Sequence, residues 1–169
     1  MKNNKSTIVL ICLIVILALF ITLSLMKKNA KTDDNEEETI EKFYLSDKYY
    51  NNGEFILVDD KGLKDINKDN YILYTYNNFC IFTIPCEDIF KEVMTKYNLD
   101  IVSITFEDFK KTDFYKTVNL APSILIVKEG KIITYLRADS DEDFDRYQDS
   151  KAFEEWLDEF IYLEKEANE

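Results

Sequence analysis

The chain has 169 residues, the length of one domain, and carries 33 acidic against 21 basic side chains, a formal net charge of −12 at pH 7. This negative charge argues against nucleic acid as a partner, because nucleic-acid phosphates are bound by Lys and Arg. The sequence contains no histidine, which excludes Ser-His and Cys-His nucleophile pairs and histidine-based metal sites, so we expect neither a metal site nor a cofactor.

The first predicted element is a membrane-spanning helix at residues 7–26, after a short tail at residues 1–6. The segment is apolar and carries no charged side chain, and a helix of this length spans about 30 Å, the thickness of a bilayer core. The alternative, a cleaved signal peptide, fits less well because the apolar run is long and no A-x-A site follows it.

The orientation of this helix is nearly balanced, because lysines flank it on both sides. The short tail before it and the acidic residues after it favour a C-terminal domain outside the cytoplasm. We therefore expect a single-pass protein of the cell membrane with an extracytoplasmic domain.

Residues 27–53 are predicted to form an acidic linker and a docking segment, followed by a folded domain at residues 54–169. Five of the basic residues and none of the acidic ones lie in the first 31 positions, so the remaining chain has a net charge of −17. Residues 40–45 are apolar enough for a short docking helix, and Asn51-Asn52-Gly53 predicts a turn.

The first half of the domain is predicted to alternate strands and helices. After a strand at residues 54–58 we expect a short helix capped by Asp60. Residues 71–76 are rich in β-branched and aromatic side chains with little alternation, which is typical of a central strand covered on both faces. Apolar residues then recur with helical spacing over residues 87–97. Pro85 lies just inside the start of that helix, where a missing N–H costs nothing.

The second half is predicted to contain a strand, an irregular helix, a hairpin of two strands and a final helix. These elements are expected at residues 100–106, 109–118, 123–127 with 132–137, and after residue 150. Gly130 favours the hairpin turn, an acidic loop occupies residues 138–149, and Ser150 is expected to cap the last helix. The order β-α-β-α-β-α-β-β-α predicts an α/β fold.

Two stretches of this chain resemble the thioredoxin-like fold family. Phe79-Cys80, then Pro85-Cys86 and the helix after them, resemble the W-C-G-P-C segment of that family. Thirty-six residues after Cys86, Ala121-Pro122 heads a strand-turn-strand that resembles the family's cis-proline loop and terminal hairpin. The resemblance covers about residues 54–163, and it implies a central mixed sheet flanked by helices and a cis peptide bond before the proline.

The resemblance also implies thiol-disulfide exchange. A cysteine at a helix N-terminus forms its thiolate readily and attacks a disulfide, and a second cysteine resolves the mixed disulfide. By this resemblance Cys80 attacks and Cys86 resolves. The residues expected to bind the substrate, a protein or peptide with cysteines, lie around them: Phe82, Pro85, Ala121 and Pro122.

The spacing of the two cysteines departs from the family pattern, which has two residues between them where this chain has five. In one alignment Cys80 is the nucleophile and three residues are inserted. In the other, Thr83 takes the place of the nucleophile and Cys80 is extra, so ordinary exchange at the motif is impossible. The family's buried acid is also missing, since Tyr74 falls near its position.

Three interpretations of Cys80 and Cys86 therefore remain open: a redox pair, a structural disulfide, and unpaired thiols on a degenerate site. The apolar tip beside them is either buried or exposed to a partner; it comprises Ile81, Phe82 and Ile84.

Two functions follow. The first is a membrane-anchored thioredoxin-like protein that exchanges thiols and disulfides on exported proteins. The alternative is a catalytically degenerate thioredoxin-like module that binds a partner in an accessory complex for export or assembly at the cell surface. A third interpretation is a cytoplasm-facing domain with idle, reduced thiols.

Overall fold

The computed structural model describes residues 41–77 and 84–165. These residues belong to one compact unit. The predicted tail and membrane helix, residues 1–26, lie outside the described residues. Within the described ranges, no helix combines the length and the apolar character needed to cross a membrane.

The unit contains a five-stranded mixed sheet. Its strands are β1 (Phe55–Val58), β2 (Asn70–Tyr76), β3 (Ile101–Thr105), β4 (Ser123–Lys128) and β5 (Lys131–Arg137). They lie in the order β1-β3-β2-β4-β5. Strands β1 and β2 pair in parallel with β3, whereas β4 runs antiparallel to both β2 and β5. The predicted α/β class, the mixed sheet and the order of the elements are confirmed.

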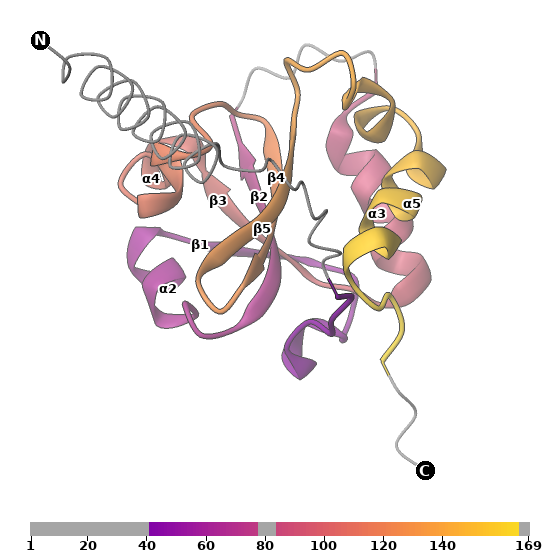
Figure 1. Ribbon diagram of the computed structural model, residues 1–169, viewed down its shortest axis with the longest axis horizontal. Helices are drawn as coiled ribbons and strands as arrows, with labels where there is room; N and C mark the ends of the chain where they lie inside the picture. Colours follow the sequence, from indigo (N-terminus) through magenta and orange to yellow (C-terminus); the bar gives the residue numbers. More distant parts are fainter. Residues whose placement is uncertain (1–40, 78–83, 166–169) are drawn as a thin grey trace, which may run out of the picture. The chain divides into compact units, whose positions relative to one another are not determined.

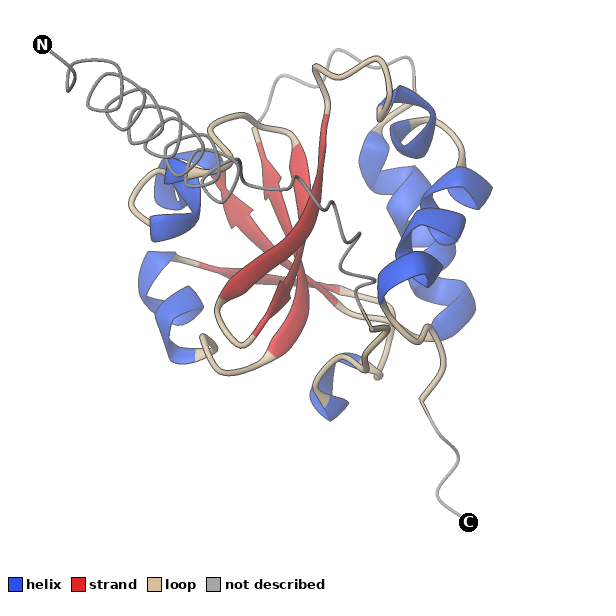
Figure 2. Ribbon diagram, in the orientation of Figure 1, coloured by secondary structure: helices blue, strands red, loops and turns tan. Residues whose placement is uncertain are grey.

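Helices cover both faces of this sheet, as Figures 1 and 2 show. On one side α2 (Asp60–Asp65) packs on β1, and α4 (Phe106–Phe109) packs on β2 and β3. On the other side α3 (Cys86–Tyr97) and α5 (Ser150–Phe160) pack against each other. The irregular helix predicted after β3 is found as α4 and a separate 3-10 turn, η2 (Asp113–Lys116).

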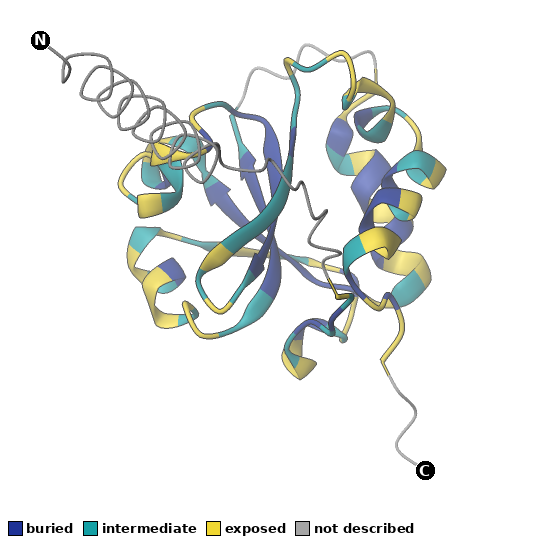
Figure 3. Ribbon diagram, viewed as in Figure 1, coloured by how far each residue is buried: buried dark blue, intermediate teal, exposed yellow. Residues whose placement is uncertain are grey.

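The middle of the sheet forms the core. Residues 71–75 of β2 are all buried, as a strand with helices on both faces requires. Figure 3 shows buried residues along the central strands and on the inner side of α3. There, Phe90 contacts the rings of Tyr74 and Phe153 at centroid distances of 5.3 and 4.6 Å. The apolar stripes of α3 and α5 are thus joined to the sheet by aromatic packing.

Both predicted helix caps are displaced by one residue. The side chain of Asp59, not Asp60, accepts a hydrogen bond from the Gly62 N–H at 2.8 Å. At the last helix Asp149 accepts from the Ala152 N–H, also at 2.8 Å, and Ser150 is the first helical residue. In both cases the capping residue has extended backbone angles, and its carboxylate reaches the third helical N–H.

The described part of the segment before β1, residues 41–53, packs against the domain. Residues 41–46 form no helix, and a 3-10 turn, η1 (Asp47–Tyr49), follows them. Phe43 forms a parallel bridge with Ile161, and both Leu45 and Tyr49 are buried. The compact unit therefore includes residues that we expected to precede the domain.

Candidate functional site

Cys86 is the first residue of α3, and its side chain is fully buried. Pro85 occupies the N-cap position with a φ of −55°, and its carbonyl accepts a hydrogen bond from the Asp88 N–H at 3.0 Å. A proline fits here because the first N–H groups of a helix have no partner within the helix. The structure thus puts Cys86 at a helix N-terminus, with its sulfur turned into the protein.

Two side chains lie close to the sulfur. The Tyr74 hydroxyl, from β2, lies 3.5 Å from Cys86 Sγ and donates a hydrogen bond to Glu87 Oε1 at 2.6 Å. Glu87 Oε2 lies 3.8 Å from the same sulfur. Burial raises the pKa of Tyr74 well above its ordinary value, and the neighbouring Cys86 and Glu87 raise it further. Tyr74 therefore stays a neutral hydroxyl that can donate to Glu87.

The carboxylate beside Cys86 comes from the helix and not from the strand. The expected position of a buried acid on β2 is occupied by Tyr74, while Glu87 supplies the acid from the first turn of α3. This pairing could not be recognised in the sequence, because Glu87 suits the helix dipole whether or not it touches the cysteine.

The Ala121-Pro122 loop is held at the same end of β2. The peptide bond between these two residues is cis, as the resemblance implied. The Asn77 side-chain amide, just beyond β2, donates to the Ala121 carbonyl at 3.0 Å. In the sheet Thr75 lies opposite Ser123, the residue after the proline. The cysteine and the proline loop are thus both anchored to the C-terminal half of β2.

Gln148 binds the backbone of Ile84, the first described residue of the segment before α3. Its amide nitrogen donates to the Ile84 carbonyl at 3.1 Å, and its amide oxygen accepts from the Ile84 N–H at 3.4 Å. Its neighbour Tyr147 is fully buried, and burial followed by the charge of Cys86 raises the pKa of this tyrosine. Gln148 was not identified from the sequence, since it lies in a loop 64 residues from its partner.

Four of the six predicted site residues are described: Pro85, Cys86, Ala121 and Pro122. The other two, Cys80 and Phe82, lie outside the described residues, as does Thr83. Of the apolar tip only Ile84 is described, and 42% of it is exposed. Pairing of the two cysteines and the roles of these residues remain predictions.

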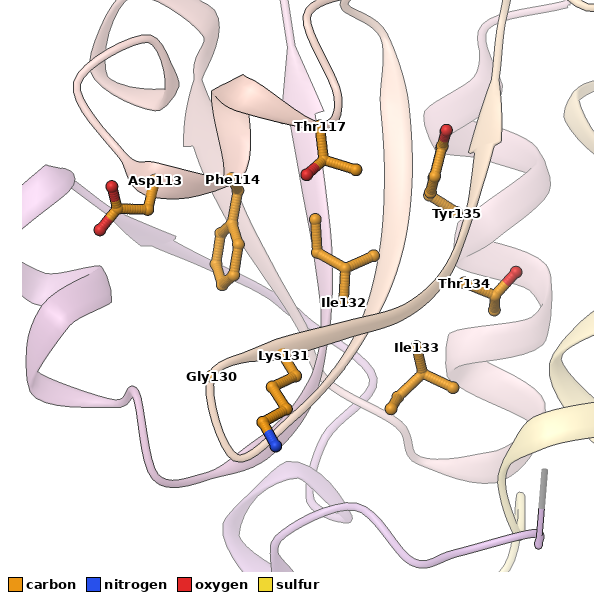
Figure 4. A pocket seen from close by; sticks show the side chains of 9 residues that line it. All are labelled: Asp113, Phe114, Thr117, Gly130, Lys131, Ile132, Ile133, Thr134 and Tyr135. Atoms are coloured by element: carbon orange, nitrogen blue, oxygen red, sulfur yellow. The ribbon is translucent and has the colours of Figure 1, made fainter. Parts of the chain in front are cut away.

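A pocket of about 240 Å³ opens beside Tyr74 and Glu87, the two side chains that contact Cys86. We call it the Glu87 pocket; its lining residues are Phe55, Leu57, Tyr74, Tyr76, Glu87 and Ser103. A larger hollow of about 550 Å³ lies elsewhere, between η2, the β4–β5 turn and β5, as Figure 4 shows. Neither the larger hollow nor the Glu87 pocket is lined by a cysteine among the described residues, but Tyr74 and Glu87 in the lining of the Glu87 pocket both contact Cys86 Sγ, so this pocket lies beside the thiol.

Two acidic side chains of the loop before α5 form ion pairs with nearby arginines. Arg137 pairs with Asp139, and Arg146 pairs with Asp143, each at 2.8 Å. Among the described residues, no group of acidic and cysteine side chains is arranged to hold a metal ion.

The described fold is similar to solved thioredoxin structures. A point-mutant thioredoxin from Halobacterium salinarum matches with a TM-score of 0.50 and 14% identity, over 68% of this chain and 97% of that chain. Oxidised thioredoxin from Plasmodium falciparum matches with a TM-score of 0.43 and 14% identity, over 61% and 98% of the two chains. No family model and no curated protein matches the sequence. At such low identity the likeness establishes the fold and leaves the activity to the site.

Proposed function

We propose that this chain, which has a thioredoxin-like fold, exchanges thiols and disulfides with exported polypeptides. The observation that carries the proposal is the position of Cys86, buried at the start of α3 behind Pro85. The cis Ala121-Pro122 loop, anchored to the same end of β2, adds support. A helix N-terminus favours a thiolate, which is the form of cysteine that reacts with disulfides.

The burial of Cys86 supports the second, resolving step for this residue. A fully buried sulfur does not meet a polypeptide disulfide directly, so Cys80 is proposed as the attacking residue. Its thiolate attacks the substrate disulfide, a mixed disulfide forms, and one substrate sulfur leaves as a thiolate. Cys86 then attacks the Cys80 sulfur and releases the second substrate sulfur. The protein ends as a disulfide, the substrate as a dithiol, and an external dithiol must reduce the protein again.

Reduction of insulin by the full-length protein in detergent tests this proposal. We expect wild type to reduce insulin, Cys80→Ser to be inactive, and Cys86→Ser to accumulate a mixed disulfide through Cys80. Cys12→Ser is the matched control, because Cys12 lies in the predicted membrane helix. Absence of activity in wild type, with no trapped species in either variant, would overturn the proposal.

The second candidate is a binding module without exchange chemistry. It is favoured by Thr83, which stands three residues before Cys86, where the alternative alignment puts the nucleophile. Such a protein would use the same face of the fold to hold a partner during export or assembly. The insulin experiment separates the two candidates.

We further propose that residues 7–26 anchor the protein in the cell membrane with its domain outside the cytoplasm. Their apolar composition and length support this proposal. Deletion of residues 1–26 is expected to release the protein from carbonate-washed membranes. Protease added to intact cells is expected to cleave the domain of the full-length protein, and full protection would contradict the orientation.

A further inference from the structure

We propose that the Glu87 pocket binds a lysine or arginine side chain of the polypeptide substrate. This inference rests on the proposed function for the existence of such a substrate, and it adds the chemical class of residue that lies beside the reacting disulfide. Four features carry it: the lack of a cationic partner for the Glu87 carboxylate among the described residues, the aromatic walls of the pocket, its volume, and the charge of the chain.

The Glu87 carboxylate has no cationic partner among the described residues. It is only partly exposed, and its contacts are the neutral Tyr74 hydroxyl at 2.6 Å and the Cys86 sulfur at 3.8 Å. A partly buried carboxylate is stabilised best by a charge-assisted hydrogen bond from a cation. Other partly exposed carboxylates do have such partners, as Glu154 has with Lys96. A ligand that completes the Glu87 site should therefore be positively charged.

The walls of the pocket suit the remainder of a basic side chain. Phe55 and Tyr76 both contact Tyr74, with ring centroids 5.8 and 6.0 Å from it. Aromatic faces attract ammonium and guanidinium groups. Leu57, which lines the pocket and is 64% exposed, offers an apolar surface for the methylene stem.

The size of the pocket points to one side chain and not to a larger ligand. Its volume of about 240 Å³ is below the range of about 300–1,000 Å³ that is typical of small-molecule sites. The net charge of −17 beyond residue 31 also draws basic polypeptides towards the domain. Because Glu87 Oε2 is 3.8 Å from Cys86 Sγ, a bound cation would lie beside the site of exchange.

Two short cysteine-free peptides that differ only in a central lysine or norleucine test the proposal. Their dissociation constants are measured by NMR titration of the full-length protein in detergent. We expect the lysine peptide to bind about tenfold more tightly, as one partly buried cation–carboxylate contact together with a cation–π contact implies. The difference should shrink as NaCl is added.

The matched variants are Glu87→Gln and Asp88→Asn, which remove the same charge from the same helical turn. The Glu87→Gln side chain would keep the shape of glutamate and still accept from Tyr74, so the fold is expected to persist. Asp88 is exposed and does not line the pocket. We expect Glu87→Gln to abolish the preference for lysine and Asp88→Asn to retain it. Tyr76→Leu, which keeps the wall apolar without a ring, is expected to weaken the preference.

Equal binding of the two peptides by wild type would overturn the proposal, and so would an equal loss of preference in both charge variants. Because the peptides contain no cysteine, their binding does not depend on exchange chemistry. A protein that reduces insulin without preferring lysine contradicts this inference alone. A protein that prefers lysine without reducing insulin contradicts only the proposed exchange.

Discussion

At the scale of single residues, Asp100 shows how one buried carboxylate joins the segment before β1 to the sheet. The residue is 3% exposed, and its Oδ1 accepts hydrogen bonds from the N–H groups of Asn52 at 3.2 Å and Glu54 at 2.8 Å. Between these two residues Gly53 has a φ of +68°, and a Cβ there would lie 2.6 Å from the Met94 carbonyl oxygen. The turn that the sequence predicted at Asn51-Asn52-Gly53 is thus fixed by a distant acid.

We predict that Asp100→Ala lowers the free energy of unfolding by about 1.5–3 kcal/mol, because hydrogen bonds to a charged acceptor are lost. Asp100→Asn should cost less, since its side-chain oxygen still accepts. Urea denaturation measures both values. Glu92→Ala, on the exposed side of α3, serves as control and should change stability by no more than about 0.5 kcal/mol. An Asp100→Ala protein as stable as the control would contradict the assignment.

At the scale of elements, the helix caps distinguish the structure from the sequence-based expectation. Asp149 lies before the helix and accepts from the Ala152 N–H, whereas Ser150 is the first residue of α5. We predict that Asp149→Ala lowers the free energy of unfolding by about 1 kcal/mol and that Ser150→Ala leaves it nearly unchanged. Thermal or urea unfolding of the two variants measures these losses. A larger loss in Ser150→Ala than in Asp149→Ala would favour Ser150 as the cap, as expected from the sequence.

The contact between α3 and α5 should give stability a defined pH dependence. Lys96 pairs with Glu154 at 2.7 Å, and the Tyr97 hydroxyl donates to the same carboxylate at 2.7 Å. Lys96 first and Tyr97 second hold the pKa of Glu154 below its ordinary value of 4.5. A carboxyl whose pKa is lower in the folded state stabilises the fold above its unfolded pKa, and this contribution disappears as the pH falls through the folded pKa.

We therefore predict that Glu154→Gln is less stable than wild type at pH 7 and that the difference vanishes well below pH 4.5. The loss at pH 7 should be small, because Lys96 is exposed and Glu154 is partly exposed, so solvent screens the pair. Urea midpoints of both proteins across this pH range provide the measurement. Glu155→Gln, one residue along the exposed side of α5, is the control, and a difference that persists at low pH would show that packing and not charge is involved.

The elements could be predicted because each is encoded locally. The run of β-branched and aromatic residues at 71–76 reflects a strand buried on both faces, and the helical spacing of residues 87–97 reflects a helix buried on one face. Both elements are found within one residue of their expected ends. The contacts of the site could not be predicted in this way. Tyr74 and Glu87 meet only because β2 and α3 pack together, and Gln148 reaches Ile84 across 64 residues.

At the scale of the whole molecule, the excess of negative charge should make salt stabilising. The 33 acidic side chains outnumber the 21 basic ones, and folding brings these like charges closer together than they are in the unfolded chain. Added salt shortens the screening length and weakens this repulsion. It also weakens surface ion pairs such as Lys42–Asp158, but such pairs contribute little to stability. We predict that the urea midpoint at pH 7 rises when NaCl is added.

The sign of this effect depends on net charge, which supplies the control. Near pH 4.5, the isoelectric point of the sequence, acidic and basic charges balance and the long-range repulsion is removed. Only attractive pairs then remain to be screened, so added NaCl should leave the urea midpoint unchanged or lower it. A midpoint that rises equally at both pH values would instead indicate exclusion of salt from the protein surface. A midpoint that falls at pH 7 would mean that local ion pairs outweigh the repulsion of the whole chain.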